Sequence, residues 1–254
     1  MNGIMYSISS KMYIPELMNI IFPNSCRFCA AVLEKGSCIC SSCLKSVEII
    51  EGAACRRCGA PVLFGEAGSD CPQCADLDFT CGRNESLGVY RGKLRELIHL
   101  FKFQKRRSLS RLFARLVTGI KSGYIGEHDL LIPVPLTRER RAERGFNQSY
   151  LVAKEIAKKA VVGFGGVAMS RKGNARPQSS IPTREERLRN ITDRFSLRKF
   201  ARRVVQGKRV LLFDDVFTTG ATVSRCARVL YEAGAQSVDL LTLARALVEP
   251  ALTS

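Results

Sequence analysis

The sequence predicts an α/β fold with a parallel central sheet, preceded by a small cysteine-rich module. Four C-x2-C pairs lie between residues 26 and 74, and apolar segments alternate with amphipathic helical patterns after them. Near the end, an apolar run is followed by two aspartates, a hydroxyl-rich turn and a helix. Alternating strands and helices are typical of a sheet covered by helices, with ligands at the carboxyl ends of its strands. A chain of 254 residues can bury one such core and a smaller module.

The composition is strongly basic, with a formal net charge of +17. Two tetrathiolate zinc sites would lower this to about +13. Such an excess of Lys and Arg indicates a polyanionic partner, although solubility accounts for part of it. We find no secretory signal and no run of about 20 apolar residues, so we expect no membrane span and a cytoplasmic location. Thiols stay reduced there, which favours metal binding over disulfides.

The cysteine pairs predict two structural zinc sites. A C-x2-C turn places two thiolates on one side of a tight loop, and two such turns complete a tetrahedral site. The segment is too poor in large apolar residues to fold on its own core, so zinc is expected to stabilise it. Sequential pairing is the simplest, and an interleaved pairing also fits. The eight expected ligands are Cys26, Cys29, Cys40, Cys43, Cys55, Cys58, Cys71 and Cys74.

The other cysteines and both histidines lack metal-ligand spacing. Cys38 could compete with Cys40, but the C-x2-C spacing favours Cys40. Cys81 has no partner pair, and Cys226 falls on the apolar side of a predicted helix, so both are expected to be core or spare thiols.

A helical connection is expected between the module and the sheet. Apolar residues recur at helical spacing from Leu94 to Phe101 and again from Leu109 to Ile120. The turn between these helices is basic. It can bind nucleic acid or be a solvated charge run, and its expected phosphate contacts are Lys102, Lys105, Arg106 and Arg107.

Apolar segments then predict the strands of the sheet. Residues 130–136 are expected to form the first core strand, ended by its prolines, and residues 163–170 the second. Residues 138–148 open a helix that continues through residue 157, and residues 235–246 form a last strand. The stretch 171–194 holds six arginines and is too long and polar for a passive connection, so we expect a mobile lid over an anionic ligand.

The segment 210–222 carries the candidate site. Four apolar residues, Val210 to Phe213, form a strand buried on both faces, and Asp214 and Asp215 follow it. Amides and hydroxyls at the start of the next helix bind phosphate, while the acidic pair suits a sugar diol with Mg²⁺. The alternative is a capped helix without a ligand, but a cap needs only one such residue. The expected phosphate loop consists of Thr218, Thr219, Gly220, Ala221 and Thr222.

This segment resembles the signature of type I phosphoribosyltransferases, which bind phosphoribosyl pyrophosphate (PRPP). The resemblance implies that Asp214 and Asp215 are the catalytic acids and hold the ribose hydroxyls. It also implies that the loop 218–222 takes the 5′-phosphate and that Mg²⁺ accompanies PRPP.

The whole chain resembles the ComF/GntX family, in which a cysteine module precedes a phosphoribosyltransferase domain. The resemblance rests on the cysteine pairs and on the segments 133–136, 144–148, 187–190 and 214–222. It implies a zinc-ribbon-like module at 23–80, a helical connection or hood at 81–127 and a type I phosphoribosyltransferase domain at 128–250. Ala175 stands where the family commonly has threonine. The lid residues are expected to be Arg171, Gln178, Arg187 and Asn190.

The family resemblance implies a role in DNA uptake during natural competence. Three hypotheses follow: a glycosyltransferase-class enzyme that joins a nitrogen nucleophile to the ribose of PRPP, a competence protein that binds single-stranded DNA, and an adaptor whose zinc module docks a helicase or translocase. Basic residues are plentiful, but the chain has no Trp for base stacking. We favour a PRPP-binding protein of DNA uptake, and transferase turnover remains an open expectation.

Overall fold

The computed structural model describes residues 25–34, 37–62, 71–74, 79–172 and 195–247, in two compact units, 1–47 and 48–254. Among its described residues, the first unit holds one short helix, α2 (Ser41–Lys45). The Cys40 thiol caps this helix by accepting the Cys43 N–H. No helix within the described ranges is both long and apolar enough to cross a membrane.

The second unit is built on a five-stranded parallel sheet with the order β1-β7-β6-β2-β3. The strands are β1 (Asn84–Val89), β2 (Leu130–Pro133), β3 (Gly163–Phe164), β6 (Arg209–Phe217) and β7 (Ser237–Arg245). Because β6 and β2 are neighbours, their carboxyl ends meet at one edge of the sheet. The parallel sheet expected from the sequence is therefore present.

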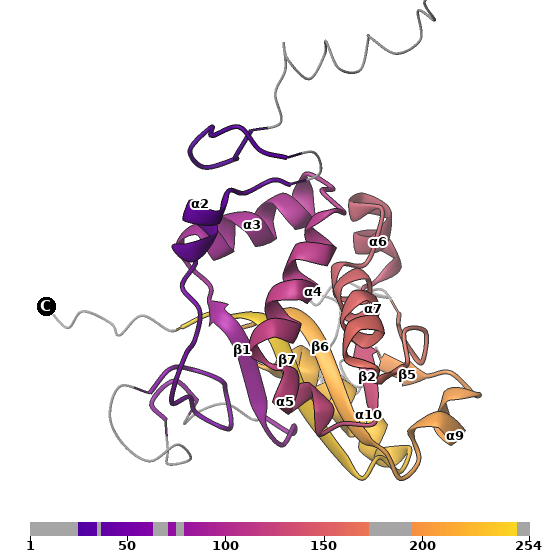
Figure 1. Cartoon of the computed structure of the whole chain (residues 1–254). Helices are drawn as coiled ribbons and strands as arrows, with labels where there is room; N and C mark the ends of the chain where they lie inside the picture. Colours follow the sequence, from indigo (N-terminus) through magenta and orange to yellow (C-terminus); the bar gives the residue numbers. More distant parts are fainter. Residues whose placement is uncertain (1–24, 35–36, 63–70, 75–78, 173–194, 248–254) are drawn as a thin grey trace, which may run out of the picture. The chain divides into compact units, whose positions relative to one another are not determined.

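The two faces of β6 are both covered, which explains its continuous apolar run. Val210 and Leu212 belong to a core cluster with Val223 and Cys226 of α10 (Ala221–Glu232). Side chains alternate along a strand, so Leu211 lies on the opposite face. On that face α7 (Gln148–Ala160) contacts β2 and β6 and packs against α4 (Leu109–Ile120), as Figure 1 shows.

A cluster of buried phenylalanines joins α3 (Gly92–Phe103) to this helical layer. The ring of Phe101 lies 5.6 Å from that of Phe113 in α4 and 5.5 Å from that of Phe146, measured between ring centroids. All three rings are buried. The helical spacing expected for 94–101 and 109–120 is thus confirmed, and the packing fixes the end of α3 beside the sheet.

The sequence analysis predicted residues 130–136 as the first core strand. That prediction was wrong, because β1 lies earlier in the chain and belongs to the same sheet. β1 holds two buried polar residues: the Ser86 and Thr242 hydroxyls lie 2.7 Å apart, and the Asn84 amide donates to the Cys58 carbonyl. Gly88 is needed here because a Cβ would come within 2.3 Å of the Glu48 carbonyl oxygen. Only tertiary contacts make such a polar segment a core strand.

Two further elements are shorter than expected. The predicted strand 163–170 is interrupted by a turn in which the Ala168 N–H donates to the Gly165 carbonyl, leaving β3 and β4 (Met169–Arg171). The helix expected from 138 onward is divided into α6 (Arg138–Arg144) and α7. Gly145 ends α6 with a φ of 76°, and the Asn147 side chain caps α7 by accepting the Tyr150 N–H.

The remaining described elements lie around the sheet. They are α5 (Ser122–Gly126), α9 (Ala201–Val205) and β5 (Phe195–Leu197), which pairs antiparallel with β4.

Candidate functional site

The carboxyl end of β6 carries the acidic pair, and both carboxylates have ordered partners. The Ser149 hydroxyl donates to Asp214 Oδ1 over 2.9 Å, and so does the Asp215 N–H. Burial raises the pKa of Asp214 to about 7, and the neighbouring charge of Asp215 adds to this effect. Two carboxyls so close resist joint ionisation, so the pair attracts a cation or hydroxyl donors.

The side chain of Lys102 supplies such a cation in the structure. Its Nζ lies 2.7 Å from Asp215 Oδ1, and only 14% of the Lys102 side chain and 13% of the Asp215 side chain are exposed. The sequence analysis assigned Lys102 to nucleic acid with three neighbours that are exposed. The structure gives it a different position, at the last turn of α3 and directed toward the acidic pair.

Lys102→Met should therefore raise the pKa of Asp214 above about 7, since the Lys102 charge lowers it in the parent protein. Carbon NMR of labelled aspartate carboxyls measures this directly. Lys121→Met is the matched control, because Lys121 is equally buried and pairs with Glu85 at 3.0 Å. An unchanged titration of Asp214 in Lys102→Met would show that the Lys102 charge does not act on Asp214.

The candidate phosphate loop follows the acidic pair and opens α10. Thr218, Thr219 and Ala221 are exposed, whereas Gly220 is buried with a φ of 76°. A Cβ at Gly220 would come within 2.9 Å of the Phe79 ring, so no larger residue fits. The first-turn amides of α10 lack carbonyl partners within the helix and favour an anion. The loop is thus open to solvent on its polar side and fixed on its apolar side.

A cavity of about 460 Å³ lies beside the carboxyl end of β2, next to the acidic pair's strand. Aromatic and apolar side chains such as Phe146 and Tyr150 form part of its wall. No acidic residue lines it among the described residues, and five arginines do: Arg107, Arg138, Arg141, Arg171 and Arg198. This cavity favours an anionic occupant.

Residues of the motif 144–148 line the cavity and also hold α7 in position. Asn147 caps α7 and its amide donates to the Val134 carbonyl at the end of β2. The Arg144 guanidinium donates to Gln148 Oε1, which is buried. The motif thereby fixes α7, and with it Ser149, against the end of the sheet.

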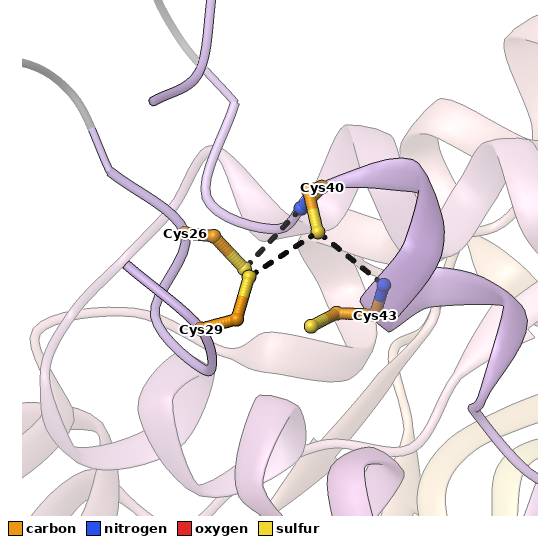
Figure 2. A group of neighbouring side chains, drawn as sticks. All are labelled: Cys26, Cys29, Cys40 and Cys43. Atoms are coloured by element: carbon orange, nitrogen blue, oxygen red, sulfur yellow. Dashed lines mark hydrogen bonds between the residues drawn. The ribbon is translucent and has the colours of Figure 1, made fainter. Parts of the chain in front are cut away.

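The first cysteine cluster lies in the unit 1–47, where Cys26, Cys29, Cys40 and Cys43 face one another (Figure 2). The sulfurs of Cys29 and Cys40 are 3.6 Å apart. Four thiolates at about 2.3 Å from zinc would lie about 3.8 Å apart, so the donor set fits the metal. Burial opposes ionisation of Cys26, but backbone N–H groups led by that of Cys40 outweigh it and lower its pKa to about 6.

The second cluster lies in the other unit and shares its core. It consists of Cys55, Cys58, Cys71 and Cys74, which could hold a metal ion together. The sulfurs of Cys55 and Cys74 are 3.8 Å apart and those of Cys58 and Cys71 are 3.9 Å apart, which again fits zinc. Burial raises the pKa of Cys58, and the Ala60 N–H and then the positive charge of Arg245 oppose that rise. The sequential pairing expected from the sequence is confirmed in both clusters.

Other predicted residues have mixed outcomes. Cys81 and Cys226 are buried outside both clusters, as expected. Of the lid residues, Arg171 is described at the end of β4, while Gln178, Arg187, Asn190 and Ala175 lie outside the described residues. Sequence reasoning missed Ser149, Arg245 and the ion pair of Lys102 with Asp215, because no local motif relates these side chains to β6.

Comparisons with known proteins agree with this organisation. A double zinc ribbon domain model matches residues 17–75, and a phosphoribosyl transferase domain model matches residues 147–251. DNA utilization protein YhgH of Shigella flexneri is 31% identical, covering 89% of this chain and 98% of that protein. Competence protein ComFC of Bacillus subtilis (strain 168) is 28% identical, covering 82% of this chain and 84% of that protein.

Among solved structures, the allosteric regulatory enzyme of purine biosynthesis matches with a TM-score of 0.40 and 22% identity. That match covers 54% of this chain and 26% of the enzyme. The predicted fold class, a type I phosphoribosyltransferase fold with a parallel sheet after a four-cysteine, zinc-ribbon-like module, is confirmed by the domain matches and the sheet.

Proposed function

We propose that this chain, which belongs to the ComF/GntX family of competence-related, phosphoribosyltransferase-type proteins, binds PRPP with Mg²⁺ and serves DNA uptake in the cytoplasm. The observation that carries PRPP binding is the continuous order of strand, acidic pair, exposed threonine loop and helix start along 209–222. In this proposal Asp214 and Asp215 accept hydrogen bonds from the ribose hydroxyls. The first-turn amides of α10 and the hydroxyls of Thr218, Thr219 and Thr222 bind the 5′-phosphate.

Magnesium would neutralise the pyrophosphate and bring a second cation toward the acidic pair. The chain's own contribution is to hold the ribose in place, and Lys102 must leave Asp215 or share it when the sugar hydroxyls bind. The direct test is calorimetric titration of the full chain with PRPP, with and without Mg²⁺. Binding that needs Mg²⁺ supports the proposal, and no binding at millimolar PRPP contradicts it.

The arginine-lined cavity favours transfer chemistry as one candidate activity. A nitrogen nucleophile would bond to the anomeric carbon of the ribose as the bond to pyrophosphate breaks. Pyrophosphate would leave with the electron pair, and the nitrogen would lose its proton to solvent. The arginines beside β2 would bind that anion. Release of pyrophosphate from PRPP in the presence of candidate bases measures this activity. The adaptor hypothesis, in which the zinc module docks a helicase or translocase, stands on the module alone.

Single-stranded DNA binding is the second candidate function, favoured by the names of the relatives and by the exposed cations after α3. Lys105, Arg106 and Arg107 are all exposed. Arg107 donates to the Gly145 carbonyl and lies over the Phe146 ring at 5.3 Å, so its guanidinium is held at the cavity edge. A strand crossing this turn would also reach the cavity that Arg107 lines.

Replacing Lys105, Arg106 and Arg107 with alanine should flatten the salt dependence of DNA binding. Each phosphate contact contributes roughly −0.7 to the log–log slope for a single strand, so the triple variant should lose about 2. Fluorescence anisotropy with a labelled oligonucleotide across a salt series measures the slope.

The matched control for this variant removes three exposed cations elsewhere, at Lys199, Arg202 and Arg203. It should keep the parent slope, and Lys102→Met should keep it too if Lys102 serves the acidic pair. A triple variant with the parent's slope and affinity would show that the turn is only a solvated surface.

A further inference from the structure

Arg245, at the end of β7, is a fully buried cation with unusual partners. Its Nη1 donates to the carbonyls of Phe217, Thr218 and Ala246, with 2.8 Å to Thr218. Its Nη2 donates to the Gln73 carbonyl over 3.1 Å. The guanidinium also lies 4.7 Å from the centre of the Phe217 ring. No ion pair joins it to a carboxylate among the described residues. Burying an unpaired charge is costly, so an anion is expected nearby.

Of the four carbonyls to which Arg245 donates, those of Thr218 and Gln73 belong to different sites. Thr218 is the first residue of the candidate phosphate loop, and Gln73 lies inside the Cys71–Cys74 turn of the second cysteine cluster. That cluster, when it holds zinc, has a net charge of −2 and supplies the missing anion. The Arg245 side chain therefore links the second cysteine cluster to the backbone of the phosphate loop.

A second set of contacts follows the same route. The Phe79 ring meets that of Phe217 edge to face at 5.2 Å and packs where Gly220 admits no Cβ. The Thr80 N–H donates to the hydroxyl of Ser224 in the first turn of α10. The cluster cysteines also share one apolar core with Phe217 and Val223. Phe79 and Thr80, which follow the second cluster in the sequence, thus contact residues on both sides of the loop, and the cluster cysteines belong to the core on which the loop rests.

We propose that the second cysteine cluster and Arg245 together hold the phosphate loop in its binding conformation. Zinc occupancy of this cluster then controls phosphate-ligand affinity, and Arg245 is a positioning residue. The affinity part rests on the proposed function, whereas the control of loop order does not. Coupling between sites is reciprocal, so a ligand bound at the loop should also retain the zinc of this cluster.

The experiment uses the full chain carrying Cys29→Ser and Cys40→Ser, in which the remaining zinc is that of the second cluster. Zinc is withdrawn with a chelating dye in the presence and absence of PRPP and Mg²⁺. We expect PRPP to lower the zinc dissociation constant about tenfold, within the range usual for coupled sites. Hydrogen exchange of the amides from Gly220 to Ser224 should speed up as zinc leaves, and by more than that of the β2 amides, which report general destabilisation of the sheet.

Arg245→Met and Arg245→Lys test the link at full zinc occupancy. Lysine keeps the charge but lacks the planar guanidinium that donates to the Thr218 and Gln73 carbonyls at the same time. We expect both variants to keep zinc and the sheet, to lose PRPP affinity about tenfold, and to lose most of the zinc protection by PRPP. Arg209→Met, an exposed arginine paired with Asp129, is the matched control and should change neither.

The outcomes separate the two proposals. Equal PRPP affinity with and without zinc in a folded chain, or coupling that persists in Arg245→Met, overturns the inference. If the parent chain does not bind PRPP at all, the proposed function fails. Exchange at Gly220 to Ser224 then still decides whether zinc and Arg245 order the loop, and unchanged exchange contradicts it.

Discussion

Replacing Asp214 and Asp215 together with asparagine should abolish Mg²⁺-dependent PRPP binding and leave the fold intact. Asparagine keeps the size of each side chain and can still accept from the Ser149 hydroxyl, but it removes both negative charges that hold the sugar and its metal. We expect calorimetry to show no saturable binding at concentrations that saturate the parent protein. The melting temperature is the check on folding.

Asp129→Asn is the control for this variant, because it also neutralises an aspartate of the sheet unit. Asp129 pairs with Arg209 outside the candidate site. It should keep the parent affinity for PRPP. A double variant at 214 and 215 with unchanged affinity would refute the site.

The same carboxyls predict a pH dependence. The pKa of Asp214 is raised to about 7, so Asp214 is mostly protonated at pH 6 and mostly ionised at pH 8. If sugar binding needs the ionised form, affinity should be about tenfold lower at pH 6 than at pH 8. Asp214→Asn should lose this dependence, and Asp129→Asn should keep it.

As pH rises, the contribution of Asp214 to the free energy of unfolding should fall, whereas PRPP affinity should rise. The folded chain keeps the Asp214 proton that the unfolded chain releases near its ordinary pKa of 3.8. Folding is therefore favoured by this group at low pH, and its contribution is lost as pH rises from about 4 to about 7. Denaturant unfolding of the parent and of Asp214→Asn at several pH values measures the difference.

The second large effect concerns the metals: elemental analysis of protein purified without added metal should find two zinc ions per chain. Both clusters offer four thiols whose ligand atoms lie within 4.8 Å of one another. A structural zinc contributes about 10–16 kcal/mol, so its loss should unfold whatever depends on it. A value near one would leave a single cluster as the site, and a value near zero would refute both.

Chelation should act differently on the two clusters. The first belongs to the unit 1–47, and its loss should not lower the melting temperature of the sheet. The second shares a core with α10 and β6, so its loss should destabilise the sheet unit as well. Cys26→Ser and Cys55→Ser, each losing one ligand, compare the two effects by thermal unfolding. Equal effects on the sheet would contradict this division.

Local sequence patterns determined much of this fold. The C-x2-C spacing identified all eight cysteines of the two clusters because a two-residue turn fixes the distance between its thiols. Continuous apolar runs predicted β6 and β7, and helical spacing predicted α3, α4, α7 and α10, because these patterns reflect burial on known faces. The order of strand, acids and glycine loop likewise placed the candidate site at the end of β6.

Tertiary contacts decided the rest. β1 is a core strand because Asn84 and Ser86 find hydrogen-bond partners far along the chain, which no pattern within six residues can announce. Lys102 looked like one cation of a basic turn, yet it reaches Asp215 because the packing of Phe101 aims the end of α3 at the sheet. Arg245 joins a cysteine turn to the phosphate loop across 172 residues of sequence. Sequence spacing sets what a residue can do locally, whereas charges and polar groups acquire their partners only when folding brings distant segments together.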